Sequence, residues 1–405
     1  MKKKSLLYFQ SGGPTSVINT SLYGVITEAK KHPEIDGIYG AIHGIEGVLN
    51  DRLIDLRAED EETVELLKQT PGAALGSARY KLSNDIHDDD YKRIVEVVKK
   101  HNIGYLLVNG GNDSMDTCTK LSKLFKEIDY DCNVMGIPKT IDNDLYGLDH
   151  SLGFPSAAKY VAQSLQDIQI DNLSYDKGKV LIVEVMGRHT GWLTAAAVML
   201  PEELRPDRIY FPEEDFDIDE FGALIKEKYE EKGKAFIVIS EGVDANIPSE
   251  DVRVDSFGHK QLGGLASELG SYVQDKFDVP VRAVEFSLMQ RAGVSHITKV
   301  DQNEAIRISR KAVRSVLKDS NSGKMVALKR GVTSTGKYKS TCYLQKASKV
   351  ANVERKLPEE FIDDIHNGNG DLMREYLAPL IEDGIKLDYE NGITKYAQLK
   401  KVRVE

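Results

Sequence analysis

Cysteine is scarce in this sequence. Cys118, Cys132 and Cys342 are the only three among 405 residues, and no two of them form a Cys-x-x-Cys pair. An odd number of widely spaced cysteines does not suit the disulfide framework of a small secreted domain or the ligand set of a structural zinc ion. The cysteine content therefore indicates a reducing compartment, and we expect a cytoplasmic protein.

Long apolar runs and an excess of positive charge are also missing. No stretch approaches the roughly 20 apolar residues of a membrane span, and the short run in MKKKSLLYFQ leads directly into a glycine turn, which predicts a core strand rather than a signal peptide. The formal net charge of −10 argues against a nucleic-acid or anionic-membrane partner. If this protein binds phosphate, its basic groups must be gathered in a local pocket.

Five short apolar runs end in turns that contain glycine or charged residues. Continuous β-branched runs that alternate with helical patterns indicate a parallel sheet covered by helices on both faces. Ligands bind at the carboxyl ends of the strands in such sheets, so we expect all five turns to lie at one rim. The runs are SLLYFQ (5–10), IGYLLV (103–108), NVMGI (133–137), KVLIVEV (179–185) and AFIVIS (235–240).

Two glycine pairs follow the first two of these runs, as SGGPTS and NGGNDS. A glycine pair before a helix removes side-chain bulk and leaves backbone N–H groups free to bind an anion. Gly12 and Gly13 belong to the first pair and Gly111 to the second, where Ser114 is expected to cap the helix. A tight strand–helix turn would explain one such pair, but two in the same context favour a phosphate site. No Walker or Gly-x-Gly-x-x-Gly sequence is present, which argues against a dinucleotide cofactor.

The segment PKTIDNDL contains the groups needed for phosphorylation of an alcohol. That reaction needs a carboxylate to accept the hydroxyl proton and cations to neutralise the transferred group. Asp142 and Asp144 are expected to face opposite ways, one towards the alcohol and the other towards a metal or a helix end. Lys139 can reach a transferred phosphate. The alternative is an Asx-rich turn with solvated charges.

Arginine and glutamate residues follow later strands. Arg188 in MGRHTGW suits a phosphate oxyanion, and Glu241 in SEGVD can accept bonds from sugar hydroxyls. Arg282 and Arg291 flank an apolar run and suggest a clamp for a phosphomonoester, with surface salt bridges as the alternative.

Taken in order, the motifs SGG, GSAR, GGNDS, PKTIDND, MGRHTGW, SEG and R…QRAG resemble the phosphofructokinase family over residues 4–292. The resemblance implies reversible transfer of a phosphoryl group to the 1-hydroxyl of fructose 6-phosphate, with Mg²⁺. It makes Asp142 the catalytic base and places Asn112 and Asp142 at the metal. It implies that Arg282 reaches the sugar phosphate in the site of a neighbouring subunit. Lys179 replaces an arginine that family members present to a neighbour in the same way. A homo-oligomer, either a dimer or a tetramer, is therefore expected.

The resemblance further implies two sets of contacts. Donor phosphates would meet Gly12, Gly13, Arg79, Gly111 and Ser114. The sugar phosphate would meet Thr140, Ile141, Asp142, Met186, Gly187, Arg188, Glu241, Arg282, Leu288, Arg291 and Lys179.

Five departures from the family pattern bear on the substrates. Asp113 and Lys139 stand where members that use ATP generally have glycines, and a carboxylate there would repel the α-phosphate of ATP, so the resemblance favours inorganic pyrophosphate as the donor. Asp113, Lys139 and Arg188 join Asp142 as expected catalytic residues. The other three are Asn112 for an aspartate at the metal, Lys179 for an arginine and Leu288 for a histidine at the sugar phosphate, and together they could shift the acceptor towards a longer ketose phosphate. The alternatives are an ATP-dependent enzyme and a catalytically silent sugar-phosphate sensor.

The expected fold is a two-lobed α/β body with parallel-rich sheets covered by helices and a helical extension at the C-terminus. We assign residues 1–139, completed by about 257–305, to a donor-phosphate lobe and residues 140–256 to a sugar-phosphate lobe. Residues 306–405 are expected to be helical and to pack on the second lobe, with EEFIDDIHNG and DLMREYLAPLIED as two helices.

Overall fold

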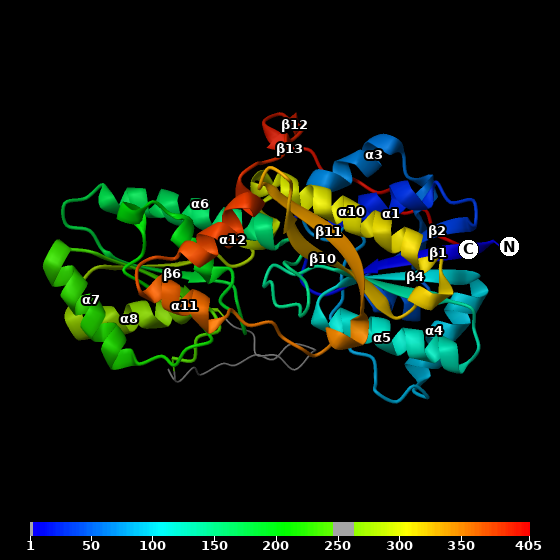
Figure 1. Ribbon diagram of the computed structural model, residues 1–405, viewed down its shortest axis with the longest axis horizontal. Coiled ribbons are helices and arrows are strands. Elements are labelled where there is room, and N and C mark those ends of the chain that lie inside the picture. The colour runs from blue at the N-terminus through cyan, green and yellow to red at the C-terminus, as the bar shows by residue number, and fades with distance from the viewer. Residues whose placement is uncertain (1–2, 246–262) are drawn as a thin grey trace.

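The chain forms two α/β lobes side by side (Figure 1), as a computed structural model describes it for residues 3–245 and 263–405. One lobe contains a seven-stranded sheet of order β11-β10-β5-β4-β1-β2-β3, and the other a four-stranded sheet of order β7-β8-β6-β9. Helices cover both faces of each sheet, so the predicted two-lobed, parallel-rich fold is confirmed. No helix within these two described ranges is long and apolar enough to cross a membrane.

The first sheet is parallel apart from its two edge strands, β3 and β11. Its strands are β1 (Lys4–Gln10), β2 (Ile35–Ala41), β3 (Leu53–Asp55), β4 (Ile103–Gly110), β5 (Asn133–Pro138), β10 (Lys324–Val332) and β11 (Tyr338–Lys346). Helices α1 (Ile18–Ala29) and α10 (Lys299–Val316) cover one face, and α4 (Asp89–Lys100) and α5 (Asn112–Glu127) cover the other.

The strand β1 shows why this sheet is buried on both faces. Its side chains point alternately to opposite faces. Leu6 and Tyr8 pack with α1 and α10, whereas Leu7 and Phe9 pack with α4 and α5, and all four are fully buried. A continuous apolar run is therefore what a central parallel strand requires.

The second sheet is parallel throughout. Its strands are β6 (Val180–Val185), β7 (Arg208–Tyr210), β8 (Ala235–Ser240) and β9 (Val281–Glu285). One face packs against α6 (Phe154–Leu173), η3 (Thr194–Met199), α11 (Glu359–His366) and α12 (Asp371–Ile381), and the other against α7 (Ile218–Lys232) and α8 (Leu265–Phe277). Short elements complete the fold: α2 (Gly44–Leu49), α3 (Glu61–Leu66), α9 (Met289–Ala292), β12 (Tyr389–Glu390) and β13 (Ile393–Thr394).

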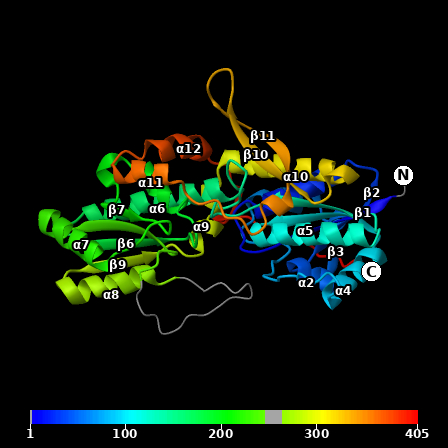
Figure 2. The ribbon, with the colours of Figure 1, turned by 60° about the horizontal axis from the view of Figure 1, so that its bottom comes forward.

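The last hundred residues differ from the helical segment expected on the second lobe. The helices α11 and α12 do pack there, but α10 lies on the first lobe and β10 and β11 form a hairpin that extends the first sheet. Figure 2 shows the end of this hairpin projecting beyond the helices. The hairpin side chains are buried up to Leu328 and largely exposed after it, which explains why the apolar pattern fades there.

The assignment of β9 also differs from expectation. The range 257–305 was expected to complete the first lobe, but β9 pairs with β6 in the second sheet. The apolar pattern of a strand does not specify which sheet it joins. The expected boundary at residue 256 lies outside the described residues, and the one at residue 139 stays a prediction.

The five strand-end turns lie at two facing rims, because β1, β4 and β5 belong to one sheet and β6 and β8 to the other. The expectation of a single rim was therefore wrong. Residues that follow all five strands line one cavity, which lies between the lobes.

Candidate active site

The cavity between the lobes has a volume of about 490 Å³. Its walls come from the turns after the five strands, from Arg79 and Lys81, and from a segment near the C-terminus. The lining residues are Ser11, Gly12, Gly13, Pro14, Arg79, Lys81, Gly111, Asn112, Asp113, Ser114, Lys139, Thr140, Ile141, Asp142, Asp144, Met186, Arg188, His189, Glu241, Arg291, Asn352 and Glu354. Most of the predicted site residues are thus brought together.

The first glycine turn leaves room for two cations. Gly12 has a φ of 75°, in the left-handed region that favours glycine. A Cβ on Gly12 would lie 3.3 Å from Lys139 Nζ, and one on Gly13 would lie 2.9 Å from a terminal nitrogen of Arg291. The glycines therefore allow a lysine and an arginine to approach the main chain where a donor phosphate is expected.

The second glycine turn leads into α5, which begins at Asn112 with Gly111 as its N-cap. No side chain caps this helix, so the expectation that Ser114 does so was wrong. Ser114 already lies in the first turn and packs beneath Gly110, where an added Cβ would overlap its hydroxyl. The uncapped N–H groups, whose helix dipole favours an anion, sit on the cavity wall together with Asp113.

Lys139 follows β5 and joins the two glycine turns. Its Nζ donates to the Gly13 carbonyl at 2.7 Å, and its main-chain N–H donates to the Gly110 carbonyl at 3.1 Å. Its side chain is almost fully buried. Burial lowers the pKa of Lys139 to about 8, opposed by the charge of Asp142. An anion bound here would favour the charged form.

Asp142 and Asp144 line the same cavity, so the expectation that they face opposite ways was wrong. Residues two apart in an extended segment point to the same face, so the alternation of a strand does not require the two carboxylates to diverge. Between them, Asn143 has a left-handed φ of 56°. The Thr140 hydroxyl accepts the Asp142 N–H at 3.1 Å and donates to its carboxylate at 3.4 Å. Asparagine tolerates the left-handed conformation better than most residues, and its place in this motif thus has a structural reason.

Burial raises the pKa of both carboxyl groups. For Asp142, the nearby Arg188 and the Thr140 hydrogen bond oppose the rise. For Asp144, repulsion by Asp142 adds to burial, and its pKa reaches about 7. Two interacting carboxylates of this kind are typical of sites that handle protons.

Asn112 and Asp144 together fit a divalent cation. The Asn112 amide nitrogen donates to Asp144 Oδ2 at 3.0 Å, and this leaves Asn112 Oδ1 and Asp144 Oδ1 buried without a hydrogen-bond partner. Oxygen ligands of this type suit Mg²⁺, which keeps several waters and often binds through one or two carboxylates. Across the described ranges there is no cluster of three or more His, Cys, Asp or Glu residues that could hold a metal on its own.

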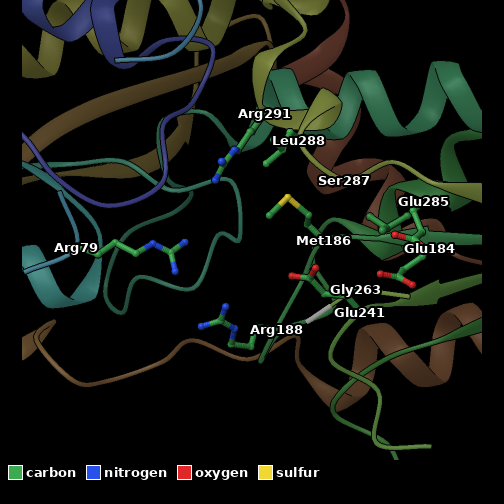
Figure 3. Close-up of a pocket in the computed structure, with 11 residues that line it drawn as sticks. Arg79, Glu184, Met186, Arg188, Glu241, Gly263, Glu285, Ser287, Leu288 and Arg291 are labelled. Atoms are coloured by element: carbon green, nitrogen blue, oxygen red, sulfur yellow. The ribbon is translucent and has the colours of Figure 1, made fainter. Parts of the chain in front are cut away.

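A second cavity of about 450 Å³ continues from the first on the side of the second lobe. Figure 3 shows Arg79, Arg188 and Arg291 pointing into it from three directions, opposite Glu241 and Glu184. Burial raises the pKa of Glu241 to about 7, and Asp142 adds to the rise. Three guanidinium groups facing carboxylates suit an acceptor that carries both a phosphate and hydroxyl groups.

Other predicted acceptor residues lie around this second cavity. Met186 and Leu288 line it, and Leu288 is 56% exposed. Gly187 donates its N–H to Glu241 Oε1 at 3.4 Å.

Arg282 and Lys179 line neither cavity as the described residues define them. Arg282 pairs with Leu181 near the amino end of the second sheet, and Lys179 immediately precedes β6 at that same end. Arg282 is exposed and Lys179 is partly exposed. In a single subunit both residues lie at the opposite end of the strands from the cavity.

The cavity also contains residues that the sequence did not point to. Lys81 and His189 are close in sequence to predicted residues, but Asn352 and Glu354 come from the segment between β11 and α11. His189 Nε2 lies 3.8 Å from Glu354 Oε1. No motif marks these late residues, and only the folded chain brings them to the site.

The chain is similar to proteins of known family. A model of the phosphofructokinase family, described as "Phosphofructokinase", matches residues 5–316. A pyrophosphate–fructose 6-phosphate 1-phosphotransferase of Halomonas elongata is 38% identical, covering 100% of this chain and 98% of the relative. A sulfofructose kinase of Alkalicoccus urumqiensis is 35% identical, covering 88% and 91%. The crystal structure of a pyrophosphate-dependent phosphofructokinase from Nitrosospira multiformis superposes with a TM-score of 0.87 at 36% identity, covering 100% and 98%.

Proposed function

The chain belongs to the phosphofructokinase family, and on that premise we propose that it transfers a phosphoryl group from inorganic pyrophosphate to the 1-hydroxyl of D-fructose 6-phosphate. The products are fructose 1,6-bisphosphate and phosphate, and the reaction is reversible. Full-length relatives with the corresponding names support this proposal.

The observation that carries the choice of donor is the placement of Asp113 and Lys139. Both line the donor side of the cavity, at the first turn of α5 and beside Gly13. A carboxylate there repels a third phosphate and a nucleoside, while a lysine there supplies charge to a donor made of two phosphates only. The same pair of side chains thus disfavours ATP and favours pyrophosphate.

The chemistry follows from the positions of the side chains. Asp142 accepts the proton of the 1-hydroxyl, and Lys139, Arg188 and the uncapped N–H groups of α5 stabilise charge on the transferred group. Arg291, Glu241 and the Thr140–Ile141 turn hold the acceptor, and Arg79, which lines both cavities, contacts the donor. Asn112 and Asp144, with Asp142 beside them, would hold Mg²⁺, which would further neutralise the donor phosphates.

The proposal also covers the oligomeric state, the roles of the two lobes and the cellular location of the enzyme. Arg282 and Lys179 serve the site of a neighbouring subunit in a homo-oligomer, which agrees with their distance from the cavity of their own chain. The first lobe binds the donor and the second lobe binds the acceptor. The three free cysteines agree with a cytoplasmic location.

A coupled assay with Mg²⁺ and fructose 6-phosphate, offering pyrophosphate and ATP in parallel, tests the donor. We expect turnover with pyrophosphate and none with ATP. Turnover with ATP alone would show that Asp113 and Lys139 do not exclude the nucleotide, and binding of fructose 6-phosphate without turnover would point to a sensor.

The same assay with other acceptors tests the role of Leu288. A hydrophobic side chain at the edge of the acceptor cavity offers no hydrogen bond to a terminal phosphate. Sedoheptulose 7-phosphate and a sulfofructose are the informative comparisons, and we expect the highest kcat/KM for fructose 6-phosphate.

A further inference from the structure

The loop that carries Asp142 and Asp144 has no helix or strand of its own. It connects β5, which ends at Pro138, to α6, which begins at Phe154. Asn143 and Gly147 within it have positive φ values of 56° and 80°. A loop of this kind keeps a defined shape only if other parts of the chain bind its main-chain polar groups.

Arg355, from the segment between β11 and α11, supplies three such contacts. Its main-chain N–H donates to the Asp144 carbonyl at 2.7 Å. One nitrogen of its guanidinium donates to the carbonyls of Leu148 at 3.1 Å and Asp149 at 2.5 Å. A single residue, more than 200 positions later in the chain, therefore binds both ends of the stretch Asp144–Asp149.

Arg355 is itself held in place by the second lobe. The carbon at the centre of its guanidinium lies 4.3 Å from the centre of the Trp192 ring, and the indole N–H of Trp192 donates to the Arg355 carbonyl at 3.1 Å. Trp192 is 1% exposed. Stacking on a buried aromatic ring together with two-carbonyl binding suits arginine and not lysine.

Tyr376 of α12 reinforces the same loop. Its hydroxyl donates to the Asp149 carbonyl at 2.7 Å and accepts from the Asn143 amide nitrogen at 3.0 Å. The Asn143 amide oxygen in turn accepts the Ser151 N–H at 2.9 Å. Arg355 and Tyr376 thus share one acceptor, the Asp149 carbonyl, and Tyr376 also binds Asn143, the left-handed residue between the two carboxylates.

We propose that Arg355 is a positioning residue for phosphoryl transfer, which holds Asp142 and Asp144 at the cavity wall through the main chain of their loop. Arg355 lines neither described cavity, so it acts without touching a substrate. The inference rests on the proposed function, since it concerns the placement of the proposed base.

The first test is Arg355→Lys, which keeps the charge but loses the planar fork. Because small displacements of reacting groups reduce rates by up to about 100-fold, we expect kcat to fall about 10- to 100-fold. The KM for fructose 6-phosphate should stay within about twofold, since Arg291 and Glu241 come from other segments. The matched control is Arg314→Lys on α10, whose side chain pairs with Glu28 and lines neither cavity; it should behave as wild type.

The second test is Tyr376→Phe and its combination with Arg355→Lys. Since both side chains hold the Asp149 carbonyl, the fall in kcat of the double variant should be smaller than the product of the two single effects. Hydrogen exchange gives an independent readout: the Ser151 N–H should exchange faster in Arg355→Lys and in Tyr376→Phe than in Arg314→Lys. If Arg355→Lys does not fold, Tyr376→Phe tests the proposal on its own. We expect the same fall in kcat in that variant, with the KM for fructose 6-phosphate unchanged.

An unchanged kcat in folded Arg355→Lys, with only a lower Tm, would overturn the positioning role. An inactive wild-type enzyme with pyrophosphate would count against the proposed function instead. In that case the exchange of the Ser151 N–H still decides the inference, and an unchanged exchange rate would overturn it.

Discussion

Lys139 and Asp142 carry opposite charges on one wall of the cavity, yet burial favours the neutral form of each side chain. The pKa of Lys139 falls to about 8 and that of Asp142 rises. Their mutual attraction only partly offsets the loss of hydration. The site is therefore suited to ligands that restore the charged forms, such as a phosphate anion beside Lys139 and a cation beside the aspartates.

These shifts predict a bell-shaped pH dependence of kcat/KM for fructose 6-phosphate. Below about pH 7 the pair of Asp142 and Asp144 gains a proton and can no longer accept one from the hydroxyl, so activity falls. Above about pH 8 Lys139 loses its proton, and activity falls again. Initial rates measured from pH 5.5 to 9.5, with pyrophosphate well below its KM so that Lys139 titrates without a bound anion, test both limbs.

The variant Lys139→Arg tests whether the alkaline limb is caused by the titration of Lys139 or by the ionisation of a substrate. Arginine stays charged across this range, so the alkaline limb should move upwards while the acid limb stays in place. An alkaline limb that does not move would assign it to another group.

Asp142→Ser should remove the proposed base with little effect on the arginines that hold the acceptor. We expect kcat to fall by about 10²- to 10⁴-fold, the range of general base catalysis. Calorimetry should show that fructose 6-phosphate still binds. The control Asp275→Ser changes an exposed residue of α8 and should leave kcat unchanged; turnover that survives in Asp142→Ser would reject the base assignment.

At the scale of the elements, the strand ends were predictable and the ends of the helices were not. The runs that became β1, β4, β5, β6 and β8 are continuous and apolar because each strand is buried on both faces. By contrast, α5 starts two residues before Ser114, and its first turn has no side-chain cap. An uncapped helix start on a cavity wall runs against the usual capping preference, and such exceptions are expected at functional sites.

The loop around Asp142 and Asp144 was predictable in composition but not in backbone conformation. The motif identified the carboxylates, the lysine and the threonine, but not the left-handed φ of Asn143 between the two aspartates. That conformation is held by Tyr376 and by Ser151. Contacts between residues so far apart in sequence leave no local pattern, and the same holds for Glu354 and Asn352 in the cavity wall.

Asp113 lies in the first turn of α5, and Lys139 follows the end of β5. We expect the double variant Asp113→Gly/Lys139→Gly to change the phosphoryl donor that the enzyme uses. Removing Lys139 deletes a charged contact worth about 1.5–3 kcal/mol, so kcat/KM for pyrophosphate should fall about 10- to 100-fold. Removing Asp113 relieves the repulsion of a longer donor, so turnover with ATP should appear. Parallel assays with both donors measure the change.

The two single variants separate these effects. Lys139→Gly alone should lose pyrophosphate activity without gaining ATP activity, because Asp113 still repels the nucleotide. Unaltered preference for pyrophosphate in the double variant would show that other residues select the donor.

At the scale of the whole molecule, the chain after α10 crosses between the lobes repeatedly. The hairpin β10–β11 extends the first sheet, α11 and α12 cover the second, and the final residues return to the first lobe. There the Val404 N–H donates to the Leu53 carbonyl at 3.0 Å, and the Val402 carbonyl accepts the Asp55 N–H at 2.8 Å. These bonds cover the open edge of β3.

The exposed position of Arg282, at the opposite end of the strands from its own cavity, leads to a prediction about subunits. If Arg282 completes the site of a neighbour, a dimer mixed from Asp142→Ser and Arg282→Ala subunits has one complete site. That site combines Asp142 of the Arg282→Ala subunit with the arginine of the other subunit. Random reassociation of equal amounts makes about half of the dimers mixed, so about a quarter of the wild-type activity should return from two inactive parents.

The experiment unfolds and refolds the two variants separately and together, and compares their kcat per subunit. Refolded wild-type protein gives the yield, and a mixture of Asp142→Ser with Asp275→Ser serves as the matched control, because its active sites come only from the intact Asp142 subunits. Recovery of activity requires that Arg282 act across an interface, since a residue acting within its own subunit leaves every site of the mixture with one defect. An absence of recovery, with mixed dimers confirmed by mass spectrometry, would place the phosphate clamp within a single chain.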